Sequence, residues 1–231
     1  LMEIVTEPDL RTPADARRFL QELRQIMRYL GVSEADLEKG HLRCDANLSL
    51  TEQTKEPLDV GQLHPKTEIK NLNSFRAVER ALEYEVQRQS KLWADGHPPA
   101  VPSTRGWDDA KGTTTEQRTK EEAHDYRYFP EPDIAPITFA ADAPDRIDVE
   151  AIRASLPELP AARRVRFAEE YGVGSKEARV LTDDEAVSAY FEASVSELRG
   201  WLEAMPGLSG SAEEFWTANR STLMKLTTNW L

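Results

Sequence analysis

Residues 41–50 alternate between polar and apolar side chains without a break. Side chains along a strand point in turn to opposite faces, so this period of two predicts a strand with one face on a core. Residues 66–72 predict a second strand that carries Glu68 and Lys70 on one side. The apolar face of the first strand carries Leu42, Cys44, Ala46, Leu48 and Leu50. The chain is therefore expected to fold around at least one sheet with a one-sided core.

Helical periodicity flanks these strands. Thr12 and Pro13 are typical of a helix start, and Gly31 is a natural stop after the apolar stripe between them. A second helix is predicted from Ser74 to just before Asp95.

Beyond residue 140 only helix signals remain, with predicted starts at Asp148, Pro160, Ser175, Thr182 and Ser211. The pattern indicates an α+β fold: residues 1–140 hold an antiparallel sheet with helices, and residues 141–231 form an all-α domain.

Composition narrows the class of protein. Lys and Arg number 29 and Asp and Glu 41, which gives a net charge of −12. This charge argues against a broad phosphate-binding surface, so any nucleic acid is met locally or through a partner. No apolar run approaches the ~20 residues of a membrane span. A lone Cys44 excludes an internal disulfide, and we expect a cytoplasmic protein without a membrane partner.

The polar faces of the two predicted strands carry the candidate chemistry. If the strands lie close, Asp45 and Glu68 converge, and two carboxylates suit Mg²⁺ or Mn²⁺. Arg43 and Lys70 would then suit phosphate oxygens. The alternative is a solvated strand face with cross-strand ion pairs, and the pattern alone leaves both interpretations open.

The aromatic run at 126–129 allows two interpretations as well. Tyr126 and Arg127 could stack on a base or a ribose. Such a run also packs strands onto sheets. The sequence contains neither a Gly-x₄-Gly-Lys-[Ser/Thr] loop nor a Gly-x-Gly-x₂-Gly loop, so a nucleotide site here would be of another design.

Six segments in order along the chain resemble the B subunits of the aspartyl/glutamyl-tRNA amidotransferases. They read LMEIVTEPD (1–9), LRCDANLS (42–49), KTEIKNLNSF (66–75), RTKEEAHDYRYFPEPD (118–133), LPELP (156–160) and LTTNWL (226–231). The resemblance covers essentially the whole chain. It implies a partial glutamine-synthetase-like cradle over 1–140, followed by the helical domain over 141–231.

The resemblance also implies an activity. Such a protein uses ATP and Mg²⁺ to phosphorylate the side-chain carboxylate of Glu on tRNA(Gln) or of Asp on tRNA(Asn). Ammonia from the partner amidase (glutaminase) then displaces the phosphate, and a third, small subunit would complete the heterotrimer. The implied roles are metal ligation for Asp45 and Glu68, catalysis for Arg43 and Lys70, and substrate contact for Asn47, Tyr126 and Arg127.

The resemblance further implies that the other metal ligands lie upstream of Leu1 and that a tRNA-binding tail domain follows residue 231. We therefore expect an internal piece of a longer protein, inactive in isolation. A different class of function stays open, in which the chain is a scaffold of the same complex without catalysis.

Overall fold

The computed structural model describes residues 2–51, 63–119, 132–135, 137, 139, 147–207 and 210–230. The chain forms two compact units. The first comprises Leu1–Arg24 and Glu34–Ile147, and the second comprises Gln25–Ser33 and Asp148–Leu231. The predicted α+β class is confirmed, whereas the assignment of residues 1–140 and 141–231 to a catalytic cradle and a helical domain stays a prediction.

The first unit is built on a four-stranded sheet in the order β1-β2-β3-β4. The strands are β1 (Ala46–Leu48), β2 (Thr67–Lys70), β3 (Ser103–Asp108) and β4 (Thr113–Thr119). The β1–β2 and β3–β4 pairs are antiparallel, but β2 and β3 are parallel. The prediction of an antiparallel sheet is therefore wrong. The helix α2 (Phe75–Ala94) links β2 to β3 and lets β3 run in the same direction as β2.

Both predicted helices of the first half are confirmed. Helix α1 spans Pro13–Tyr29, and the Thr12 hydroxyl accepts the Asp15 N–H at 3.1 Å. Gly31 follows with a left-handed φ of 63°. Helix α2 begins after Ser74, whose hydroxyl accepts the Ala77 N–H at 3.0 Å. Local capping chemistry set these boundaries, so sequence reasoning could place them.

The predicted strands are present but shorter than expected. The predicted strand at 41–50 pairs with β2 only over the three residues of β1, although side-chain exposure alternates along residues 41–47 as predicted. Its partner β2 has four residues and ends at Lys70, because the φ of 64° at the following Asn71 is incompatible with an extended strand. The polar and apolar faces follow the predicted pattern even where the strand pairing does not.

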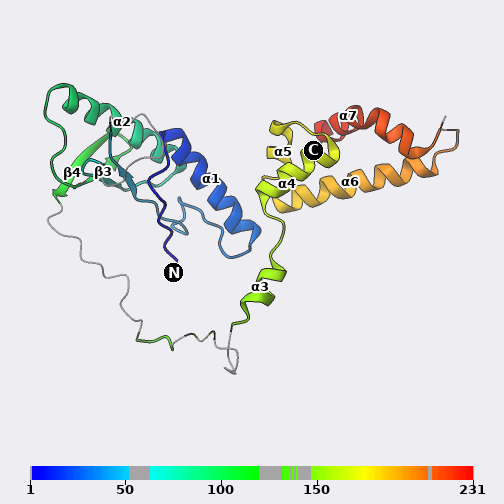
Figure 1. The fold of residues 1–231 in the computed structure, drawn as a ribbon, viewed down its shortest axis with the longest axis horizontal. Helices are drawn as coiled ribbons and strands as arrows, with labels where there is room; N and C mark the ends of the chain where they lie inside the picture. The colour runs from blue at the N-terminus through cyan, green and yellow to red at the C-terminus, as the bar shows by residue number, and fades with distance from the viewer. Residues whose placement is uncertain are drawn as a thin grey trace. The chain divides into compact units, whose positions relative to one another are not determined.

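The apolar face of the sheet packs on α2. Figure 1 shows α2 lying beside β3 and β4, and α2 contacts both β1 and β4. Half-buried Cys44, Ala46 and Leu48 of the first strand segment pack against this core. The buried residues of the core are Leu20, Ile69, Leu72, Ala77, Val78, Ala81, Leu82 and Trp107.

A buried ion-pair network joins α2 to the sheet beside this core. The Glu85 side chain is fully buried, and its carboxylate pairs with Arg105 of β3 at 3.0 Å and with Arg88 at 2.8 Å. The Thr114 hydroxyl of β4 and the Gln89 amide also donate hydrogen bonds to it. Burial alone would raise the pKa of Glu85, but the hydrogen bonds from Arg88 and Thr114 hold it below its usual value.

The second unit contains helices and, among its described residues, no strand. They are α3 (Val149–Ser155), α4 (Pro160–Arg166), the π-helical turn η2 (Phe167–Tyr171), α5 (Ser175–Leu181), α6 (Glu185–Ala204) and α7 (Ala212–Trp230). Its core contains the buried residues Phe167, Tyr171, Val173, Ala178, Leu181, Phe191, Val195, Leu202, Trp216 and Met224.

Most predicted helix starts in this half are confirmed. Asp148 caps α3, and Ser211 caps α7, where its hydroxyl accepts the Glu214 N–H at 3.2 Å. The predicted start at Thr182 is wrong, because its hydroxyl donates back to the Ala178 carbonyl at 2.9 Å and ends α5. Asp184 caps α6 instead.

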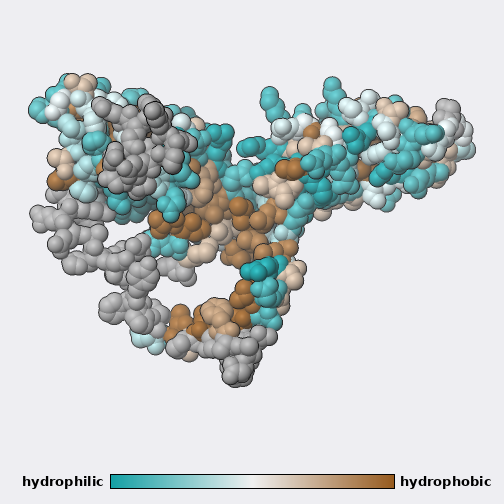
Figure 2. All heavy atoms as spheres, in the orientation of Figure 1, coloured by the Kyte–Doolittle hydropathy of each residue, from teal (hydrophilic) through white to brown (hydrophobic). Residues whose placement is uncertain are grey.

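The surface of α3 is apolar on one side. No residue of this short helix is buried, and Val149, Ile152 and Leu156 are exposed. Figure 2 shows hydrophobic side chains on the surface around this segment. Within the described part of the chain, no helix has both the length and the apolar character to cross a membrane.

Replacing Arg105 by Leu should destabilise the first unit by about 3–5 kcal/mol, because it removes one partner from a buried carboxylate. Urea unfolding followed by tryptophan fluorescence measures the loss. The matched control is Arg18→Leu, which removes an exposed ion pair to Asp15 and should change the stability far less. Equal losses in the two variants would contradict the importance of the buried network.

The lowered pKa of Glu85 also predicts a pH dependence. A carboxyl group with a lower pKa in the folded state stabilises the fold above its ordinary titration range, and this contribution is lost as the pH falls through the lowered value. Unfolding free energies measured from neutral to acidic pH should show less acid destabilisation in Glu85→Gln than in the parent protein. An unchanged acid dependence would show that Glu85 does not contribute to it.

Candidate functional site

Three of the predicted site residues meet on the polar face of β1 and β2. The Lys70 ammonium lies 2.8 Å from Asp45 Oδ2 and 3.1 Å from Glu68 Oε1. The two carboxylates thus converge on one cationic group. The side chain of Glu68 is only 13% exposed, whereas that of Asp45 is 48% exposed. The hydrogen bond to Asp45, followed by that to Glu68, raises the pKa of Lys70 and keeps it an ammonium.

The register of the sheet produces this convergence. Asn47 is the antiparallel partner of Glu68, so the two share a face. Asp45, just before β1, and Lys70, at the end of β2, lie on the same side of that pair, each two residues along the chain from its member. Asn47 is exposed beside the cluster, in agreement with its predicted position.

Thr104 is a member of this cluster that sequence reasoning missed. Its hydroxyl donates to Glu68 Oε2 at 3.2 Å, and only 1% of the residue is exposed. Thr104 is the partner of Glu68 across the parallel β2–β3 pair. No local signal marks this neighbour, because the two residues are brought together by a parallel register that depends on the packing of α2.

The other predicted residues are not part of the cluster that the structure describes. Arg43 is exposed two residues before Asp45 on the same polar side of the segment. Tyr126 and Arg127 lie outside the described residues. Their predicted roles stay predictions.

Residues 1–144 match the family described as the GatB/GatE catalytic domain, which covers every predicted site residue. The chain belongs to this family.

Curated relatives agree with the family assignment. Proteins named as the B subunit of aspartyl/glutamyl-tRNA(Asn/Gln) amidotransferase in several organisms are similar to this chain. The relative from Roseiflexus sp. (strain RS-1) is 53% identical over 86% of this chain and 39% of its own length. That from Thermomicrobium roseum is 54% identical over 85% and 38%, and that from Synechococcus sp. (strain WH7803) is 44% identical over 98% and 44%. The chain thus spans about two fifths of the length of these relatives.

The donor set of the cluster fits a hard divalent cation in this GatB-family domain. Asp45 and Glu68 offer carboxylate oxygens, which Mg²⁺ prefers. The described ranges contain no group of three or more His, Cys, Asp or Glu side chains placed to hold a metal. The cluster thus supplies two ligands, and water and phosphate oxygens are the usual further ligands of Mg²⁺.

Cys44 is on the opposite face from the cluster. It packs against the core of the sheet, and burial, followed by the negative charge of Asp45, raises the pKa of its thiol to about 11. The thiol is therefore neutral near pH 7, which excludes a ready thiolate nucleophile. The predicted position of Cys44 on the apolar face of its strand is confirmed.

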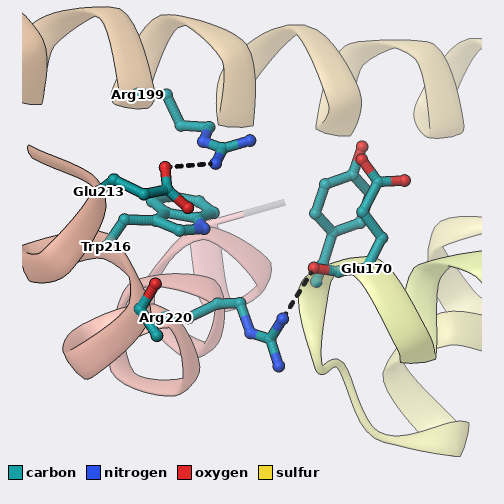
Figure 3. Close-up of a pocket in the computed structure, with 7 residues that line it drawn as sticks. Glu170, Arg199, Glu213, Trp216 and Arg220 are labelled. Carbon is teal, nitrogen blue, oxygen red and sulfur yellow. Dashed lines mark hydrogen bonds and ion pairs between the residues drawn. The ribbon is translucent and has the colours of Figure 1, made fainter.

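A separate pocket of about 270 Å³ lies in the second unit (Figure 3). Its charged side chains link helices. Arg199 of α6 pairs with Glu213 of α7 at 3.0 Å, and its guanidinium lies 4.8 Å from the ring centre of Trp216. Arg220 of α7 donates to the Glu170 carbonyl of η2 at 3.2 Å. This pocket contains no residue predicted to be functional, and its arginines have structural partners.

A double-mutant cycle tests the convergence on Lys70. We expect a coupling free energy of about 0.2–1 kcal/mol between Lys70→Met and Asp45→Asn, because both side chains are partly exposed to solvent. Urea unfolding of the two single variants and the double variant measures it. A coupling of zero at low salt would show that the ion pair between Lys70 and Asp45 contributes nothing to stability.

Proposed function

We propose that this chain carries part of the active site of a tRNA-dependent amidotransferase that is also a kinase. The enzyme would phosphorylate the side-chain carboxylate of Glu on tRNA(Gln), or of Asp on tRNA(Asn), with ATP. Ammonia would then displace the phosphate to give Gln-tRNA or Asn-tRNA. Membership of the GatB/GatE catalytic-domain family supports this proposal. The observation that carries it within the molecule is that Asp45 and Glu68 both reach the Lys70 ammonium, so their carboxylates lie close enough to share a single positive charge.

Asp45 and Glu68 would hold Mg²⁺, with Mn²⁺ as a possible substitute, because both oxygens face the same point. A bound divalent cation supplies charge neutralisation between the γ-phosphate of ATP and the anionic acceptor. A carboxylate is a poor electrophile until it carries a leaving group, so phosphorylation precedes attack by ammonia.

The remaining residues would position the reacting groups. Lys70, which now bridges the two carboxylates, has an ammonium that can turn to a phosphate oxygen once a metal takes its place. Arg43 lies on the same polar segment and would contact phosphate. Asn47 beside Glu68, together with Tyr126 and Arg127, would contact the aminoacyl end or the nucleotide.

The same proposal extends to architecture and partners. Residues 1–140 would form part of a glutamine-synthetase-like cradle, and residues 141–231 the helical domain that follows it. The partners in a cytoplasmic heterotrimer would be the amidase (glutaminase), which releases ammonia from glutamine, and a third, small subunit. The curated relatives carry the name of one subunit of an amidotransferase, which supports such an assembly.

Asp45→Asn and Glu68→Gln should each lower ATP-dependent transamidation by about 100-fold or more, because each removes a charged metal ligand. The assay uses the complete protein in complex with its partners and follows amidation of mischarged tRNA. Glutamine hydrolysis by the partner should survive in both variants. Glu83→Gln, an exposed carboxylate on α2, is the matched control and should retain activity.

Unchanged transamidation in both site variants would contradict the metal assignment. A complete protein that assembles with its partners but binds neither Mg²⁺ nor ATP would instead identify a scaffold. That result would replace the catalytic proposal with the alternative of an interaction module.

A further inference from the structure

We propose that Thr104 is a positioning residue for the metal site, whose hydroxyl holds the Glu68 carboxylate in the orientation that binds the cation. This inference rests on the proposed function, because it assumes that Glu68 is a metal ligand. It adds a residue on a third strand to the site.

The two oxygens of the Glu68 carboxylate have different partners. Oε2 accepts a hydrogen bond from the Thr104 hydroxyl at 3.2 Å, and Oε1 lies 3.1 Å from the Lys70 ammonium. The terminal torsion of a glutamate is soft, so an unheld carboxylate rotates and offers either oxygen. With Oε2 held by Thr104, Oε1 is directed to the point where the Asp45 carboxylate also arrives.

Thr104 lies between two neighbouring strands, although the β3–β4 register shifts between Thr104 and Arg105. It lies on β3, which pairs with β2 on one side and with β4 on the other. The next residue, Arg105, pairs with the buried carboxylate of Glu85 at 3.0 Å. Pairing on both sides limits the movement of the β3 backbone, and with it the positions that the Thr104 hydroxyl can reach.

The chemistry matches a known way of tuning metal ligands. A side chain that binds a metal is oriented by hydrogen bonds to those of its atoms that do not touch the metal. Removing such a hydrogen bond typically weakens metal binding by about 10- to 100-fold. Because Thr104 is only 1% exposed, water cannot readily replace its hydroxyl. The effect of the hydroxyl on the cation should therefore be measurable in a single variant.

Thr67 offers a matched control on the neighbouring strand. It is buried to the same degree as Thr104, with 1% of the residue exposed. Its hydroxyl faces α2, where it accepts from the Gln89 amide at 3.1 Å. Thr67→Val therefore loses a buried hydroxyl on the face away from Glu68.

The experiment measures Mn²⁺ binding to the complete protein, in complex with its partners, by electron paramagnetic resonance of the free ion. Thr104→Val should raise the Kd for Mn²⁺ by about 10- to 100-fold. Thr104→Ser, which keeps the hydroxyl, and Thr67→Val should stay within about 3-fold of the parent protein. In the transamidation assay, Thr104→Val should raise the Mg²⁺ concentration for half-maximal rate and leave the rate at saturating Mg²⁺ nearly unchanged.

The outcomes separate this inference from the proposed function. If Glu68→Gln weakens Mn²⁺ binding and Thr104→Val does not, the role of Thr104 is wrong while the metal site stands. If Glu68→Gln itself binds Mn²⁺ like the parent protein, the metal assignment fails. Equal weakening in Thr104→Val and Thr67→Val would overturn the inference in favour of general destabilisation.

Circular dichroism of each variant checks that it is folded. Should Thr104→Val fail to fold, Thr104→Cys replaces it, because a thiol is a weaker donor of similar size. We expect Thr104→Cys to weaken Mn²⁺ binding more than Thr104→Ser does. Parent-like Mn²⁺ binding by a folded Thr104→Cys would overturn the inference.

Discussion

The buried carboxylate of Glu85 connects the helix and the sheet on which the candidate site depends. Beside an apolar core, this carboxylate forms ion pairs with two arginines and accepts hydrogen bonds from a threonine hydroxyl and a glutamine amide. A buried charge of this kind is costly unless it is fully paired, so α2, β3 and β4 must come together in one register. That requirement helps to fix the position of β3 next to β2.

The polar cluster is a consequence of this arrangement. Parallel pairing of β2 with β3 sets Glu68 beside Thr104, and antiparallel pairing with β1 sets it beside Asn47. The two faces of β2 thus differ in role: one packs against the core and the other carries the polar cluster. Thr67 and Ile69 face the packed side, while Glu68 and Lys70 face the side that carries the cluster. The rigid packing on one face holds the functional groups on the other.

Local patterns predicted the parts of the fold that local chemistry determines. Alternation along residues 41–50 assigned the faces of the first strand, and Ser74 placed the start of α2. Asp45 and Glu68 were expected to converge if their strands lay close, and the structure brings them together. Local patterns could not predict how strands far apart in the sequence align with one another. The parallel β2–β3 pair, the contact of Thr104 with Glu68 and the burial of Glu85 all depend on this alignment.

A crystal structure of the complete protein grown with Mn²⁺ tests the central claim most directly, because anomalous scattering locates the ion. We predict an anomalous peak at about 2.0–2.3 Å from carboxylate oxygens of both Asp45 and Glu68, with the Lys70 ammonium displaced from between them. A peak elsewhere in the protein, with Lys70 still bridging the two carboxylates, would contradict the assignment of this cluster as a metal site.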